Sequence, residues 1–153
     1  MILSRSTLAL LGGCMLFVSI GQNSIWGSLL PYFTNYFRFH GYTEITDHDL
    51  NIVSPLQTLG IFIGQNLSIP LSNKIGSRRA MLVGLLLYCS SLITVSYAKD
   101  LTLFIFMYAG VFSMGIGILY MTPISVCVNY FPNHKGLVTG IILGCYGFSG
   151  VIL

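Results

Sequence analysis

Charged residues divide this chain into long, mostly apolar intervals. The uncharged runs cover residues 6–37, 50–73, 80–98, 101–134 and 136–153. A helix needs about 20 mostly apolar residues to cross a bilayer, and a backbone inside lipid must satisfy its own hydrogen bonds, as a helix does. The pattern therefore predicts an all-α polytopic transmembrane helix bundle, with helices over about residues 7–34, 51–71, 80–98, 102–128 and 137–153.

Composition supports the same class of protein. Only 7% of the 153 residues are charged and 54% are hydrophobic, whereas an ordinary soluble domain carries about 25% charged residues. So few charges exclude a soluble globular domain, a disordered chain and a nucleic-acid-binding protein. The expected partner is the lipid bilayer, and no nucleic acid.

Residues able to bind metals are scattered. The four cysteines, Cys14, Cys89, Cys127 and Cys145, lie in the predicted helices without paired spacing and resemble small apolar residues. We therefore expect no metal and no cofactor. An intramembrane enzyme would need paired ionisable groups, or a nucleophile beside a base, within a span, and no predicted span has them.

The basic residues predict the orientation of the helices. With a cytoplasmic N-terminus, the inner segments hold Arg5, Lys74, Arg78, Arg79 and Lys135, and the outer loops hold Arg38 and Lys99. Cytoplasmic loops are enriched in Lys and Arg, so this orientation is expected. The first apolar run is much longer than the 7–15 residues of a signal-peptide core, which argues against a cleaved leader.

The sequence predicts five helices, an odd number that suggests an incomplete bundle. Residues 147–153 are still mostly apolar and have no polar flank. We expect residues 1–153 to form an incomplete N-terminal transmembrane bundle of a longer protein. A genuine five-helix protein is the alternative.

The segment that joins the second and third predicted helices is short and basic. Leu71, Lys74, Gly76, Arg78 and Arg79 resemble the signature loop G-x-L-x-D-R-x-G-R-R of the major facilitator superfamily. The sequence departs from that pattern at Ile69, Asn73 and Ser77. In the family this loop helps to lock the two halves of the carrier in one state. The resemblance implies a gating loop at Asn73, Lys74, Gly76, Arg78 and Arg79.

A second motif narrows the resemblance. It comprises Gly115, Gly117, Tyr120, Pro123, Tyr130, Phe131, Pro132, Lys135, Gly136, Leu137 and Gly140. This set resembles the oxalate/formate antiporter and monocarboxylate transporter branch. The arginine that sugar and drug carriers place before the glycines is Val111 here. The resemblance implies a twelve-helix carrier, secondary active or facilitative, which moves mono- or dicarboxylates by alternating access with the C-terminal half of the same protein.

Polar and aromatic residues within the spans are candidate contacts for a small-molecule solute. In the superfamily the first and fourth helices line the central cavity, so we expect Gln22, Trp26 and Tyr120 to bind substrate, together with Tyr146 in the fifth helix. Hydrogen bonding between helices by Gln and Tyr, and an interfacial position for Trp, are the alternative explanations.

Small residues recur at helical spacing in two of the predicted helices. Gly60 and Gly64 share one face, and Gly136, Gly140 and Gly144 share another. Such faces let helix backbones approach closely, so we expect helix packing there. A further hypothesis is that these glycine faces contact the other half of the carrier and let the two halves slide past each other during alternating access. A non-transporting truncated or scaffold protein of the same fold remains the alternative to a transporter.

Overall fold

The computed structural model describes residues 5–39, 46–98 and 100–152, and over these residues the protein is an all-α bundle without strands. Its longer elements are α1 (Arg5–Ile20), α2 (Trp26–Phe39), α4 (Val53–Ile75), α5 (Ser77–Ser96), α7 (Ser113–Tyr130) and α8 (Lys135–Ile152). The four-residue helix α3 (Asp47–Leu50) precedes α4.

The segment predicted as one helix over residues 7–34 is interrupted. A 3₁₀ turn, η1 (Gly21–Ile25), separates α1 from α2. Its sequence, Gly-Gln-Asn-Ser-Ile, contains residues that stabilise an α-helix poorly, because glycine loses backbone entropy and Asn and Ser side chains compete for backbone hydrogen bonds. The interruption therefore has a local cause that apolar composition alone does not reveal.

The segment predicted over residues 102–128 also changes geometry part-way along. It begins as α6 (Leu101–Ile105), widens into a π-helix, η2 (Phe106–Phe112), and continues as α7. Ser113 Oγ donates a hydrogen bond to the Tyr108 carbonyl oxygen, at 3.3 Å, five residues earlier. This bond lies within the widened turn and satisfies the serine hydroxyl group inside the bundle.

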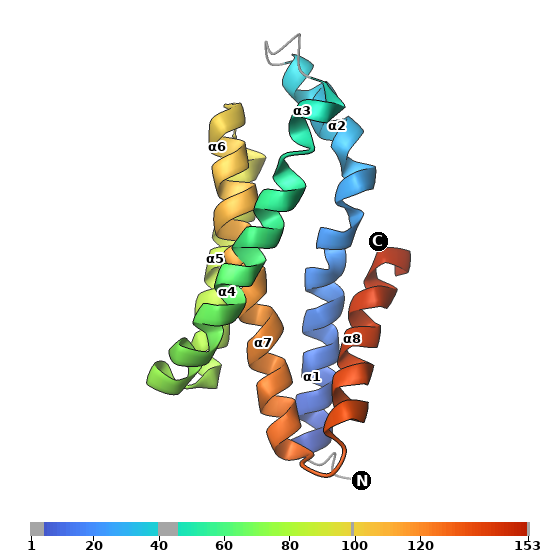
Figure 1. Ribbon diagram of the computed structural model, residues 1–153, viewed down its shortest axis with the longest axis vertical. Coiled ribbons are helices and arrows are strands. Elements are labelled where there is room, and N and C mark those ends of the chain that lie inside the picture. Colours follow the sequence, from blue (N-terminus) through green and yellow to red (C-terminus); the bar gives the residue numbers. More distant parts are fainter. Residues whose placement is uncertain (1–4, 40–45, 99, 153) are drawn as a thin grey trace.

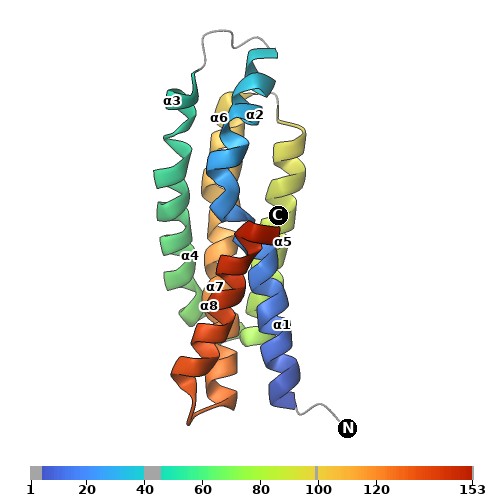
Figure 2. The ribbon, with the colours of Figure 1, turned by 90° about the vertical axis from the view of Figure 1, so that its right-hand side faces the viewer.

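Helix α7 lies at the centre of the bundle. It packs against α4, α5 and α1, while α1 packs in turn against α8. Figure 1 shows α4, α5 and α7 grouped together, with α1 and α8 side by side along α7, and Figure 2 shows the same arrangement from the side. Helix α7 therefore links the α4–α5 pair to the α1–α8 pair.

Two separate hydrophobic cores follow from this arrangement. One is built around Trp26, Phe37, Phe104, Tyr108 and Phe112, mainly from α2, α6 and η2. The other is built around Phe17, Ile20, Leu119, Val138 and Ile142, from α1, α7 and α8. Of the predicted solute contacts, Trp26 belongs to the first core, and Tyr120 and Tyr146 pack against the second.

The outer surface of the bundle is strongly apolar. Phe62, Leu82, Leu86, Phe106 and Phe148 are all more than half exposed, which suits a surface covered by lipid rather than water. Among the described residues, the helix Ser77–Ser96 and the continuous segment Leu101–Tyr130 are long and apolar enough to cross a membrane, and Ser6–Ile20 is apolar but shorter.

Candidate functional site

Trp26, at the start of α2, lies in a cluster of aromatic rings. Its ring centroid is 5.0 Å from that of Tyr108 and 5.5 Å from that of Phe33. Tyr108 stacks in turn between Phe104, at 5.4 Å, and Phe112, at 4.9 Å. Only 6% of the Trp26 side chain is exposed. Trp26 therefore lies inside the bundle and not on its outer surface.

Three buried side-chain polar atoms of the described residues have no hydrogen-bond partner. They are Asn23 Oδ1, Trp26 Nε1 and Gln57 Nε2. Gln57, on α4, is 3% exposed, and its side chain lies beside the Tyr108 hydroxyl group. Each unsatisfied buried group costs roughly 1–3 kcal/mol, so each of the three is an exception to the usual pairing of buried polar atoms.

Tyr120 and Tyr146 lie together in the other core. Their ring centroids are 6.0 Å apart, and Phe17 of α1 lies 5.0 Å from Tyr120 and 6.3 Å from Tyr146. Both tyrosines are half-buried. Helices α1, α7 and α8 thus place two phenol groups side by side, where each can donate or accept a hydrogen bond.

The four predicted contacts therefore do not form one cluster. The structure brings Tyr120 and Tyr146 together but places Trp26 with Tyr108, in the other core. The backbone of Gln22 lies in η1, and its side chain is outside the described part of the structure. Sequence reasoning missed Gln57 and Tyr108, although an amide in an otherwise apolar interval was a usable signal for the former.

The glycines of α4 face α7. A β-carbon at Gly60 would lie 2.8 Å from the Ala109 carbonyl oxygen, and one at Gly64 would overlap the Met114 carbonyl oxygen. Both positions are therefore used in packing against α7, and they are not available for a smooth face toward another bundle. That hypothesis is wrong for Gly60 and Gly64, because the close contact lies within this chain.

The glycines of α8 behave differently. A β-carbon at Gly136, Gly140 or Gly144 would meet no atom of the described residues within 4 Å. Close packing by these three glycines has no partner within the described residues, and packing against a segment outside them stays a prediction.

The loop between α4 and α5 is reduced to one residue. Gly76 has φ +87° and ψ +148°, a conformation that side-chain-bearing residues rarely adopt. Its N–H donates to the Ser72 carbonyl oxygen at 2.9 Å, and the Ser72 and Ser77 hydroxyl groups are hydrogen-bonded at 2.9 Å. Asn73 and Lys74 are exposed at the end of α4, as are Arg78 and Arg79 at the start of α5.

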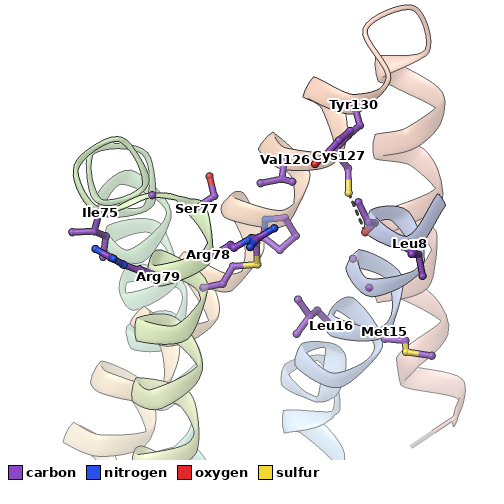
Figure 3. A pocket seen from close by; sticks show the side chains of 16 residues that line it. Leu8, Met15, Leu16, Ile75, Ser77, Arg78, Arg79, Val126, Cys127 and Tyr130 are labelled. Carbon is purple, nitrogen blue, oxygen red and sulfur yellow. Dashed lines mark hydrogen bonds between the residues drawn. The ribbon is translucent and has the colours of Figure 1, made fainter. Parts of the chain in front are cut away.

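A groove opens beside this loop, between α1, the start of α5 and the end of α7. Its volume is about 1340 Å³, and Arg78 and Arg79 line one side of it. Leu8, Met15 and Leu16 of α1 line the opposite side (Figure 3). Cys127 of α7 donates a hydrogen bond to the Ala9 carbonyl oxygen at 3.4 Å, which fixes one end of the groove.

No group of three His, Cys, Asp or Glu side chains among the described residues could hold a metal ion. The charged side chains of the described residues lie near helix ends. The α4–α5 and α7–α8 junctions, which carry Lys74, Arg78, Arg79 and Lys135, lie at the same end of the bundle as the start of α1 (Figure 1). Lys99 and Glu44 lie outside the described residues.

Comparison with known proteins decides the family. The family model described as Major Facilitator Superfamily matches residues 11–153. The chain belongs to the major facilitator superfamily. It is accordingly a multi-pass membrane protein of a transporter family.

Three curated proteins are similar to the chain, each over a different share of its length. "Apicoplast pyruvate carrier 2" of Toxoplasma gondii is 28% identical over 94% of this chain and 22% of that protein. "MFS-type transporter pytF" of Aspergillus terreus is 26% identical over 96% of this chain and 49% of that protein. "Uncharacterized MFS-type transporter YhjX" of Escherichia coli is 30% identical over 63% of this chain and 24% of that protein.

The chain thus spans between about a fifth and a half of the length of these relatives. No solved structure matches it.

Proposed function

We propose that this chain forms the N-terminal helices of a secondary active or facilitative transporter for small organic anions, mono- or dicarboxylates. Family membership supports transport. The similarity to a protein named as a pyruvate carrier, over 94% of this chain, is the observation that carries the choice of solute.

The arrangement of Tyr120 and Tyr146 is compatible with such a solute. Their rings lie 6.0 Å apart on α7 and α8, and a phenol hydroxyl group can donate a hydrogen bond to a carboxylate oxygen. The charged side chains of the described residues lie near helix ends, away from this pair. The positive charge that offsets a bound carboxylate would then come from the C-terminal half of the carrier.

Alternating access would follow from rocking of the two halves around a site near the middle of the membrane. The basic loop from Asn73 to Arg79 would face the cytoplasm, where it would act as the gating loop. Asn73 stands where the family pattern has an aspartate, so any lock formed by this loop would depend on Lys74, Arg78 and Arg79.

Uptake by proteoliposomes tests the proposal. The full-length protein should take up labelled pyruvate, lactate, formate or oxalate faster than liposomes without protein. Tyr120→Phe should lower uptake about tenfold, because one good hydrogen bond to a charged group is worth roughly 1.5–3 kcal/mol.

Tyr130→Phe is the matched control, since Tyr130 ends the same helix and is 51% exposed. It should transport at the parent rate. A correctly inserted protein that takes up none of the four acids would contradict the proposed solute class and favour a non-transporting scaffold.

A further inference from the structure

Tyr88, in the middle of α5, touches both hydrophobic cores. It packs against the core that contains Trp26 and against the core that contains Phe17. Its ring stacks on that of Phe112, in η2, with the centroids 5.1 Å apart and the planes inclined by 25°. Its backbone lies close to α7, because a β-carbon at Gly115 would come within 2.9 Å of the Tyr88 amide nitrogen. Helix α7 and η2 therefore hold Tyr88 in place independently of its hydroxyl group.

The hydroxyl group of Tyr88 contacts a further element, α1. It donates a hydrogen bond to the Ser19 carbonyl oxygen at 3.3 Å. Helix α1 ends at Ile20, so Ser19 is among its last four residues, whose carbonyl groups have no partner within the helix. Inside a bilayer, neighbouring helices supply partners for the backbone groups that a helix break leaves unpaired. Tyr88 supplies such a partner at the end of α1.

The length of this bond indicates how strongly it holds α1. Hydrogen bonds between two oxygen atoms usually measure 2.5–3.0 Å, so a separation of 3.3 Å describes a weak bond. A neutral hydrogen bond shifts an equilibrium by about two- to tenfold. The Tyr88 bond can therefore bias the position of α1 and still break readily.

The 3₁₀ turn η1 is a natural place for the first transmembrane segment to bend. Turns of this type within a longer helix often mark hinges. On one side η1 is fixed to α8, because a β-carbon at Gly21 would overlap the Ser149 Oγ atom. Helix α1 shares its core with α8, whereas α2 shares the other core with η2. A change of angle at η1 would move α1 relative to α2 and to α5, and the Tyr88–Ser19 bond opposes such a change.

We propose that the Tyr88 hydroxyl group is a latch on a hinge at η1. While it is bonded to Ser19, it holds α1 at the described angle to α2, and its release lets that angle change. The inference goes beyond the proposed function, because it concerns a movement of the chain and not the choice of solute. In a carrier, this movement would accompany the rocking of the two halves.

Tyr88→Phe tests the latch, because it removes the hydroxyl group and keeps the ring against Phe112. Spin labels at Leu8→Cys in α1 and Tyr32→Cys in α2, which are 57% and 73% exposed, convert the angle at η1 into a distance. The full-length protein, with its other cysteines replaced, is measured by pulsed electron paramagnetic resonance. Tyr88→Phe should raise the population of a second distance, relative to that of the described angle, about two- to tenfold.

Two other tyrosines provide matched controls. Tyr97→Phe removes a hydroxyl group at the end of the same helix, where the side chain is 81% exposed. Tyr108→Phe removes a hydroxyl group inside the bundle that lies beside Gln57 of α4. Both variants keep an aromatic ring, and both should show the distance distribution of the parent protein.

Amide hydrogen exchange provides a second measurement that needs no labels. In Tyr88→Phe, the peptide that contains Gly21–Ile25 should exchange about two- to tenfold faster than in the parent protein, because the hinge opens more often. Exchange in the peptides of α7 should stay the same. This comparison separates opening of the hinge from a general loss of stability.

The outcomes decide the latch separately from the proposed function. Equal distances and equal exchange rates in the parent protein and Tyr88→Phe would overturn it. Faster exchange throughout the bundle, with unchanged distances, would show that the bond only stabilises the fold and would overturn it as well. Both measurements are made without solute, so a failure to take up any of the four acids would contradict the proposed function and leave the result for the latch unaffected.

Discussion

Gly117 lets α7 approach α4 more closely than any residue with a side chain would allow. A β-carbon here would overlap the Ile61 carbonyl oxygen and lie 2.7 Å from the Gln65 amide nitrogen and 2.8 Å from the α-carbon of Gly64. All three are backbone atoms of α4, so no side-chain rotation relieves the contact. Close approach of this kind is how helices associate where lipid offers no hydrophobic driving force.

Gly117→Ala should therefore lower the stability of the protein by about 1–3 kcal/mol, as expected for added volume in a tightly packed core. The measurement is the unfolding free energy in mixed micelles, or the thermal midpoint in detergent. Gly110→Ala is the control within the same transmembrane segment, because a β-carbon there meets nothing within 4 Å. Equal stability of the two variants would contradict the packing described for α4 and α7.

Single residues also show what the sequence does and does not predict. The spacing of Gly60 and Gly64 identifies a face of small residues, but spacing within one helix does not identify the helix that it contacts. The same limit applies to Trp26 and Tyr120. Both were expected to bind solute on the basis of helix order, and the structure places them in different cores.

At the scale of helices, a buried hydrogen bond joins α4 to α7. The Thr122 hydroxyl group donates to the Ile118 carbonyl oxygen at 2.9 Å, so it accepts the hydrogen bond from the Ser68 hydroxyl group, whose oxygen atom lies 2.9 Å away. Both side chains are almost completely buried. The pair lies on the same helix interface as Gly117 and adds a polar contact to it.

A double-mutant cycle on Ser68→Ala and Thr122→Val should give a favourable coupling energy of about 0.6 kcal/mol, which is typical of hydrogen bonds between membrane helices. The unfolding free energies of the parent, the two single variants and the double variant provide this value. A matched cycle on Ser90→Ala and Thr139→Val, whose hydroxyl groups each bond to their own helix, should give none. Additive effects at Ser68 and Thr122 would show that the contact does not stabilise the pair of helices.

The apolar segments are visible in the sequence, but the π-helical break in the fourth of them is not. Charges mark where apolar segments end, because a charge in lipid is costly, and the turns at Gly76 and Pro132 are marked by their residue types. The π-helix η2 reads Phe-Met-Tyr-Ala-Gly-Val-Phe and is as apolar as an α-helix would be. A π-helical turn of this kind therefore cannot be recognised from hydrophobicity alone.

At the scale of the whole molecule, the two ends of the bundle differ in charge, because the basic junctions between helices all lie at one end. The α4–α5 and α7–α8 junctions lie at one end with the start of α1, and α3 and α6 lie at the other (Figure 1). Arg38 and the acids Asp49 and Asp100 belong to that second end. Lys and Arg are retained on the cytoplasmic side during insertion, which predicts that the Gly76 end faces the cytoplasm.

Cysteine labelling in a background without Cys14, Cys89, Cys127 and Cys145 tests this orientation. Asn73→Cys and Thr102→Cys are suitable sites, because both side chains are exposed and lie at opposite ends of the bundle. In right-side-out vesicles containing the full-length protein, a membrane-impermeant maleimide should label Thr102→Cys and not Asn73→Cys. Inside-out vesicles should give the reverse result, because the maleimide then meets the end that carries Lys74, Arg78, Arg79 and Lys135. Labelling of Asn73→Cys in right-side-out vesicles would contradict a cytoplasmic gating loop.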